Sequence, residues 1–131
     1  MRIYLDSSAI VKLVQREAES GALRTYLKRH QEDERVTSML ARVEVTRAVL
    51  AGGSAAVAHA RAELGTIHQI AVDMDVLDRA ATLSPETALR SLDAIHVASA
   101  QLVGDLRSVV TYDHRMAGAV QALGLPTAAP S

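Results

Sequence analysis

The amino-acid sequence predicts an α/β protein in which a central parallel sheet is flanked by helices. Short apolar stretches rich in β-forming residues, such as 3–5, 67–72 and 108–112, alternate with longer segments in which apolar residues recur at helical spacing. Parallel strands need a crossover connection, which is usually a helix, so this alternation is typical of a parallel sheet covered on both faces. With 131 residues, the chain fits one domain, 1–131, that has its own core.

Local signals define the elements expected in the first half of the chain. Ser7 and Ser8 open a helix directly after the strand 3–5, and residues at helical spacing predict a second helix over 20–30. Val36 and Thr37 form a short strand candidate. Ser38 is placed to cap a helix that runs to about residue 50, where two glycines follow.

The second half continues the alternation of helix and strand. The expected elements are a helix over 54–63, a strand over 67–72, a helix after Asp73 that Ser84 and Pro85 break, a helix from Ser91 to Gly104, a strand over 108–112 and a helix over 114–123. Residues 127–131 are expected to form a loose tail.

The composition limits the chemistry that the chain can perform. Cys, Phe and Trp are absent, and the chain has three tyrosines. Without Cys there is no disulfide, thiolate nucleophile or cysteine zinc site, and we expect a protein of a reducing compartment, the cytoplasm. No apolar run approaches the roughly 18 residues of a membrane span, so neither export nor membrane insertion is expected. Because the formal net charge is −1, nucleic acid would have to be bound through a local basic patch or bound cations.

Two acidic residues follow predicted strands directly. Asp6 comes after the strand 3–5, and Asp113 comes after the strand 108–112. In open α/β sheets ligands lie outside the carboxyl ends of the strands, so both carboxylates are well placed to hold a metal or to polarise a ligand. The alternative for either residue is that it caps the helix that follows.

Two further acids lie on predicted helices. Glu44 shares its helical face with small apolar residues, although it could instead pair with Arg47 on an exposed face. Asp93 shares a face with His96 and Val97, although an acid in a first turn is also favoured by the helix dipole alone. Acids that point inward need a positive partner, and no lysine has an evident position to provide one. A hard cation such as Mg²⁺ or Mn²⁺, which prefers oxygen ligands, is the simplest partner.

Four segments together give the chain a resemblance to a known family. The segments YLDSSAIVKL at the start, Glu44 on a mid-chain helix, SLDAIHVASA at 91–100 and TYDHRM at 111–116 resemble a PIN domain, specifically the toxin ribonuclease of a VapBC toxin–antitoxin pair. The resemblance covers essentially the whole chain. It implies a PIN-like three-layer fold with a central parallel sheet.

The resemblance also implies a function and a site. Asp6, Glu44, Asp93 and Asp113 would be the metal-binding and catalytic quartet of a Mg²⁺- or Mn²⁺-dependent endoribonuclease that restrains growth. Its partners would be an RNA substrate and a cognate antitoxin that folds over a groove formed by the first two helices. The supporting residues near the acids would be Ser8, Thr111 and His96, of which we expect His96 to have a structural role near Asp93 rather than a catalytic one.

Basic and apolar side chains give two further expectations. The candidates for RNA backbone contacts are Lys12, Arg16, Arg24, Arg42 and Arg115. The apolar residues Leu13, Val14, Leu23 and Leu27 suggest more apolar surface on two short helices than the core needs, so we expect a homodimer and tight binding of the antitoxin.

Other functional classes remain as alternatives. A receiver-type signalling domain also gathers acids around Mg²⁺, but it needs a late lysine, and this chain has no lysine after Lys28. A phosphatase with an aspartyl nucleophile usually has a second acid two residues later, where this chain has Ser8. A free-standing or catalytically silent RNA-binding module with the same fold is the third alternative, and metal-dependent cleavage of RNA distinguishes it from the enzyme.

Overall fold

A five-stranded parallel sheet forms the centre of the molecule in the computed structural model, which describes residues 1–83 and 85–131. The strand order is β3-β2-β1-β4-β5. In chain order the strands are β1 (Arg2–Leu5), β2 (Glu34–Ser38), β3 (His68–Ile70), β4 (Leu106–Val110) and β5 (Thr127–Ala128). The predicted α/β class with a parallel sheet is therefore confirmed.

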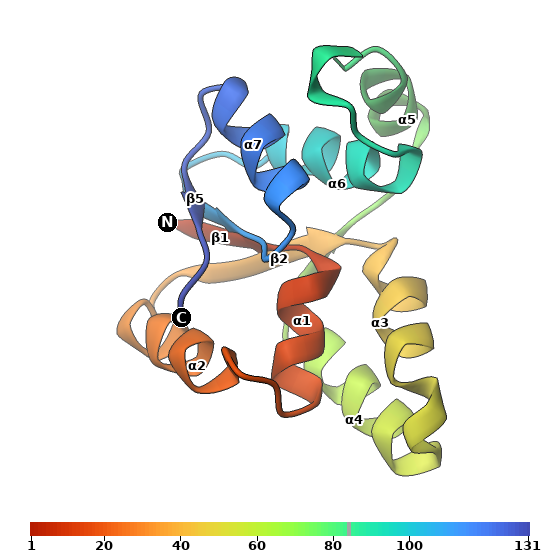
Figure 1. The fold of residues 1–131 in the computed structure, drawn as a ribbon, viewed down its shortest axis with the longest axis vertical. Coiled ribbons are helices and arrows are strands. Elements are labelled where there is room, and N and C mark those ends of the chain that lie inside the picture. Colours follow the sequence, from red (N-terminus) through yellow and green to blue (C-terminus); the bar gives the residue numbers. More distant parts are fainter. Residues whose placement is uncertain (84) are drawn as a thin grey trace.

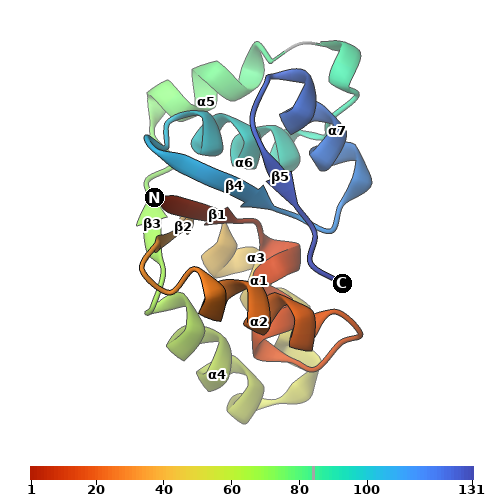
Figure 2. The same ribbon diagram turned by 90° about the vertical axis from the view of Figure 1, so that its left-hand side faces the viewer.

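Helices cover both faces of this sheet, as the two perpendicular ribbon views show (Figures 1 and 2). One layer contains α1 (Ser7–Val14), α2 (Ser20–Arg29), α3 (Ala41–Val49), the short 3-10 helix η1 (Leu50–Gly52) and α4 (Ser54–Leu64). The other layer contains α5 (Met74–Ala81), the 3-10 helix η2 (Pro85–Thr87), α6 (Ser91–Gln101) and α7 (His114–Ala122). The arrangement is the three-layer one expected of the chain.

The central strand β1 supplies side chains to both layers because successive residues of a strand point to opposite faces. Ile3 and Leu5 join the core cluster beneath α1 to α4, whereas Tyr4 joins the cluster formed with α6 and α7. All three side chains are fully buried. The buried strand therefore fixes the position of the next residue, Asp6, at the carboxyl end of the sheet.

Several expected boundaries differ from the structure. Strand β4 begins two residues before the expected position, because Leu106 pairs with Arg2 at the start of β1. Ser38 ends β2, and α3 begins only at Ala41, although the Ser38 hydroxyl accepts a hydrogen bond from the Leu40 N–H at 3.1 Å. The helix break expected at Ser84 lies outside the described residues.

Two expectations drawn from the sequence are wrong. The tail is not loose over Thr127–Ala128, since these residues form β5 beside β4, and the Tyr112 hydroxyl donates to the Pro130 carbonyl at 2.8 Å. The four apolar residues expected to leave extra surface on the first two helices are instead buried in the core: Leu13, Val14, Leu23 and Leu27. Exposed apolar side chains lie elsewhere, on α3, α5 and α6, and include Val43, Leu77 and Leu92.

No helix in the described part of the chain is long and apolar enough to cross a bilayer.

Candidate metal centre

The topology brings the four predicted acids to one edge of the sheet. Asp6 follows the carboxyl end of β1, and Asp113 comes three residues after the end of β4. Glu44 lies near the start of α3, which follows β2, and Asp93 is in the first turn of α6, which leads into β4. Because all strands are parallel, these starting and ending points lie on the same side of the molecule.

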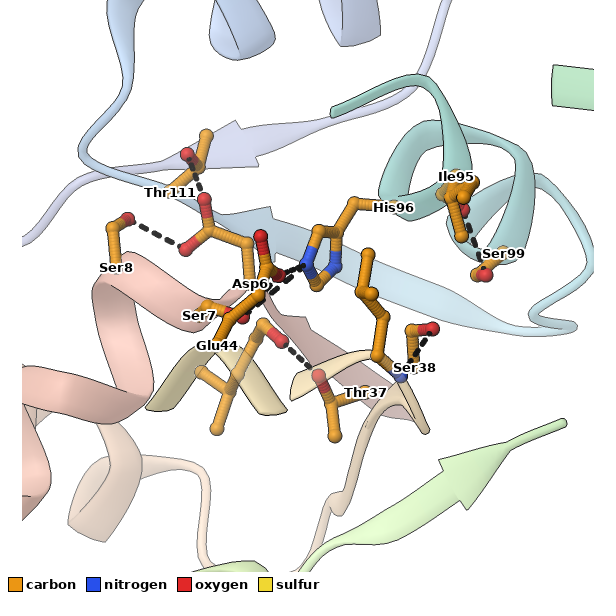
Figure 3. A network of polar contacts seen from close by, with 12 residues as sticks. Asp6, Ser7, Ser8, Thr37, Ser38, Glu44, Ile95, His96, Ser99 and Thr111 are labelled. Carbon is orange, nitrogen blue, oxygen red and sulfur yellow. Dashed lines mark hydrogen bonds and ion pairs between the residues drawn. The ribbon is translucent and has the colours of Figure 1, made fainter. Parts of the chain in front are cut away.

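Asp6 is buried and held by hydrogen bonds from α1 and from the segment that follows β4 (Figure 3). Its Oδ1 accepts from the Ser8 hydroxyl at 2.6 Å and from the Ala9 N–H at 3.0 Å, and its Oδ2 accepts from the Thr111 hydroxyl at 2.5 Å. The hydrogen bond from Ala9 makes Asp6 the N-cap of α1, so the capping role considered for Asp6 is present in the structure. Burial raises the pKa of Asp6, and the hydrogen bonds from Ser8 and Thr111 oppose that rise.

Asp113 caps a helix in the same way. Its Oδ1 accepts from the N–H groups of Arg115 and Met116 at 2.9 and 3.2 Å, at the start of α7. Its own N–H donates to the Thr111 hydroxyl oxygen at 3.1 Å. Thr111 therefore links the two acids that follow strands. Its hydroxyl donates a hydrogen bond to Asp6 and accepts one from the N–H of Asp113.

Glu44 is bound to side chains of two other elements. Its Oε1 accepts from the Ser7 hydroxyl at 2.7 Å and lies 2.6 Å from Nε2 of His96. Burial opposes ionisation of Glu44, but the hydrogen bonds from His96 and Ser7 outweigh it and lower the pKa of the carboxyl. The alternative pairing with Arg47 is not among the ion pairs of the described residues. His96 was expected to hydrogen-bond or pack near Asp93. Its ring nitrogens instead hydrogen-bond to Tyr4 and Glu44, although His96 remains close enough to act on the Asp93 carboxyl.

Asp93 lies close enough to a second acid of the quartet, Asp113, to be affected by its charge. Burial raises its pKa, the charge of Asp113 raises it further, and Arg90 opposes the rise. The Arg90 Nε lies 3.7 Å from Oδ2 of Asp93 on a side chain that is 77% exposed. The carboxylates of Asp93 and Asp113 thus repel one another, and a cation between them would relieve that repulsion.

The carboxylate oxygens of the quartet suit a hard cation that keeps several waters better than one that carboxylates enclose completely. Within residues 1–83 and 85–131, no three acidic or histidine side chains already stand at the spacing of a metal-holding group. Mg²⁺ keeps several waters and needs only one or two carboxylates, so the donor set remains suitable. Asp6 supports this fit, since it is 2% exposed and makes no ion pair with a basic side chain of the described residues.

Three side chains that contact the quartet or His96 were not identified from the sequence. Ser7 binds Glu44, and the only signal was its place beside Asp6. Arg90 could have been found from its spacing of three residues before Asp93 on one helix. Tyr4 had no signal, because its contact with His96 joins residues that are 92 positions apart.

The basic residues proposed for RNA contacts differ in how available they are. Lys12 forms ion pairs with Glu17 and Glu19 at 3.2 and 2.7 Å and lies over the Tyr112 ring, so its charge is already neutralised. Arg24 donates to the Leu13 carbonyl, and Arg42 donates to Gln69 at 3.3 Å. Arg16 and Arg115 are exposed. The arginines therefore offer more positive charge to a polyanion than Lys12 does.

Comparison with known proteins adds family information to this geometry. The model of the family described as PIN domain matches residues 3–120. The chain is 53% identical over 131 residues to ribonuclease VapC46 of Mycobacterium tuberculosis, with 98% of each chain covered. It is 40% identical to ribonuclease VapC35 of the same species, with 98% of this chain and 96% of the relative covered.

Solved structures show the same fold at lower identity. VapC20 of M. tuberculosis, described as a sarcin-ricin loop cleaving toxin, superimposes with a TM-score of 0.75 at 21% identity, covering 98% of this chain and 99% of VapC20. A chain from a toxin–antitoxin complex of Klebsiella pneumoniae superimposes with a TM-score of 0.66 at 21% identity, covering 85% of this chain and 86% of that one.

Proposed function

The chain belongs to the PIN domain family, and from this premise we propose that it is a ribonuclease that hydrolyses RNA phosphodiester bonds with the help of Mg²⁺ or Mn²⁺. The observation that carries the proposal is the gathering of Asp6, Glu44, Asp93 and Asp113 at the carboxyl edge of the sheet. Near full-length similarity to proteins named as ribonucleases supports the same reaction. A receiver domain or an aspartyl phosphatase has no comparable support.

The four acids would share one cation site in this proposal. Asp93 and Asp113, whose charges repel one another, would hold the ion together with Asp6 and Glu44. A divalent ion bound there would activate a water molecule for attack on phosphorus and offset the negative charge that develops on the phosphate. Ser8 and Thr111 keep the Asp6 carboxylate in one orientation through their hydrogen bonds. The protein itself needs no nucleophile.

Exposed arginine side chains would bind the RNA backbone. Arg90 lies beside Asp93 and is largely exposed, so it can exchange its contact with the carboxylate for a phosphate. Arg16, Arg24, Arg42 and Arg115 are exposed and would add further phosphate contacts. Lys12 contributes only when an RNA phosphate displaces Glu17 or Glu19.

A cleavage assay with purified protein tests the proposal. We expect RNA to be cut in Mg²⁺ or Mn²⁺, cleavage to stop in excess chelator, and Asp93→Asn to lose activity by orders of magnitude. Asp75→Asn is the matched control, because Asp75, like Asp93, is an acid in the first turn of a helix, but it lies on α5, outside the quartet. Undiminished cleavage in chelator would overturn the metal mechanism. RNA binding without any cleavage would instead identify a catalytically silent RNA-binding module.

We also propose that the protein is the toxin of a type II toxin–antitoxin pair, forms a homodimer and acts in the cytoplasm. Its VapC relatives support the toxin role, and the exposed Val43, Leu77 and Leu92 offer apolar surface to a protein partner. Co-expression with the neighbouring gene should yield a stable complex, and light scattering should give the mass of a dimer. A monomer that captures no such partner would leave a free-standing nuclease.

A further inference from the structure

A buried chain of hydrogen bonds joins β1, α6 and α3 through the ring of His96. The Tyr4 Oη lies 2.7 Å from Nδ1 of His96, and Nε2 of the same ring lies 2.6 Å from Oε1 of Glu44. Both Tyr4 and His96 are almost completely excluded from solvent. Figure 3 shows the His96 ring directed at Glu44, with Ser7 beside the same contact. The ring is thus tied at both nitrogens.

The direction of these hydrogen bonds follows from the chemistry of the groups. An ionised carboxylate only accepts, so Nε2 must carry the proton that it shares with Glu44. In a neutral imidazole Nδ1 then has no proton and accepts from the Tyr4 phenol. The Glu44 carboxylate therefore selects the tautomer with the proton on Nε2, and the Tyr4 phenol complements it by donating to Nδ1.

The consequence for Glu44 is that its two oxygens differ. Oε1 receives hydrogen bonds from Ser7 and His96, whereas the hydrogen bonds within the described residues leave Oε2 without a donor. Asp6 is different, because donors hold both of its oxygens. Glu44 therefore offers one oxygen to a ligand from an orientation that is fixed before the ligand arrives.

We propose that Tyr4 and His96 are positioning residues that hold Oε1 of Glu44, so that Oε2 alone is presented to the divalent cation. This inference rests on the proposed function. It assigns His96 no proton transfer with RNA, because neither of its nitrogens is free to reach a substrate. Partners behind a metal ligand fix its orientation, and their loss typically lowers metal affinity or activity about 10- to 100-fold.

Tyr4→Phe is the sharpest variant, because it keeps the shape of the buried ring and removes only the donor to His96. Tyr26→Phe is its matched control, since the Tyr26 hydroxyl also bonds a side chain, that of Ser108 at 2.7 Å, outside the site. A second pair compares His96→Ala with His96→Gln, in which the amide can again donate to Glu44. Glu44→Gln removes the negative charge of the carboxylate that Tyr4 and His96 position.

The first readout is Mn²⁺ binding to the full chain without RNA, measured from the electron paramagnetic resonance of free Mn²⁺. We expect Tyr4→Phe and His96→Ala to weaken Mn²⁺ binding about 10-fold, His96→Gln to recover part of the loss and Tyr26→Phe to bind like wild type. In cleavage assays kcat should fall in Tyr4→Phe and His96→Ala while KM for RNA changes little, because the pair does not face the substrate.

The outcomes separate this inference from the function on which it rests. Wild-type protein that binds Mn²⁺ and cuts RNA, with Tyr4→Phe and His96→Ala unchanged in both, would overturn the positioning role alone. Variants that lose only thermal stability would do the same, since that result describes a packing role. Wild-type protein that neither binds Mn²⁺ nor cuts RNA would overturn the proposed function and, with it, the inference.

Discussion

The hydroxyl of Thr111 donates a 2.5 Å hydrogen bond to Oδ2 of Asp6, so the residue after β4 holds the carboxylate that follows β1. Both side chains are buried. The contact fixes Asp6 relative to Asp113 as well, because the same hydroxyl oxygen accepts from the Asp113 N–H. The first prediction concerns this contact.

Thr111→Val keeps the shape of the side chain and removes the donor to Asp6. We expect a loss of about 1–3 kcal/mol in unfolding free energy, because a buried acceptor loses its partner, together with a large fall in cleavage rate. Thr37→Val is the control, since the Thr37 hydroxyl is equally buried and donates to the Leu5 carbonyl at 2.6 Å. It should lose similar stability and keep its activity. Equal activities in the two variants would contradict a functional role for the Thr111 contact.

Asp6→Asn removes the charge of the buried N-cap and keeps a side chain that also caps well. Burial raises the pKa of Asp6, so its ionised form opposes folding near neutral pH, and the metal-free variant should melt at the same or a higher temperature than metal-free wild type. Cleavage should fall by orders of magnitude. Mg²⁺ should raise the melting temperature of wild type more than that of the variant, because a ligand of the folded state stabilises it by mass action. A less stable, active variant with an unchanged Mg²⁺ response would leave Asp6 only its capping role.

The ionisation of Asp93 should depend on Asp113 in the metal-free protein. Burial and the charge of Asp113 together raise the pKa of Asp93. Asp113→Asn removes the second of these causes, so the pKa of Asp93 should move down toward its ordinary value while remaining above it. Titration of the carboxyl carbon by NMR measures the change directly. An unchanged midpoint would mean that the two carboxylates do not interact.

A stability prediction concerns Asp33, which lies away from the four acids. Hydrogen bonding to Arg107 lowers the pKa of Asp33 to about 2, and the amino group of Met1 lies 3.2 Å from the same carboxylate. A depressed pKa stabilises the fold above the unfolded value of 3.8, and the contribution disappears as the pH falls through about 2. Asp33→Asn should therefore melt below wild type at pH 7, and the difference should shrink across this range. Calorimetry at several pH values tests it, and a constant difference would contradict the linkage.

The sequence alone determined the α/β class, most of the elements and the four candidate acids. Each of these rests on signals within a few neighbouring residues: apolar periodicity, helix caps, and an acid placed directly after a strand, as at Asp6. Parallel strands end at a common edge, so the meeting of Asp6 and Asp113 at one side also follows from local pattern and topology.

Only the tertiary structure decided which side chains these acids contact. Glu44 and His96 are 52 positions apart, and Tyr4 and His96 are 92 apart, so their hydrogen bonds depend on how α3, α6 and β1 pack. The same is true of Leu13, which packing buries, and of β5, whose two residues become a strand only because β4 offers an edge. Periodicity specifies which face of an element is apolar, but hydrogen-bond partners are chosen across elements, where no local pattern in the sequence records the choice.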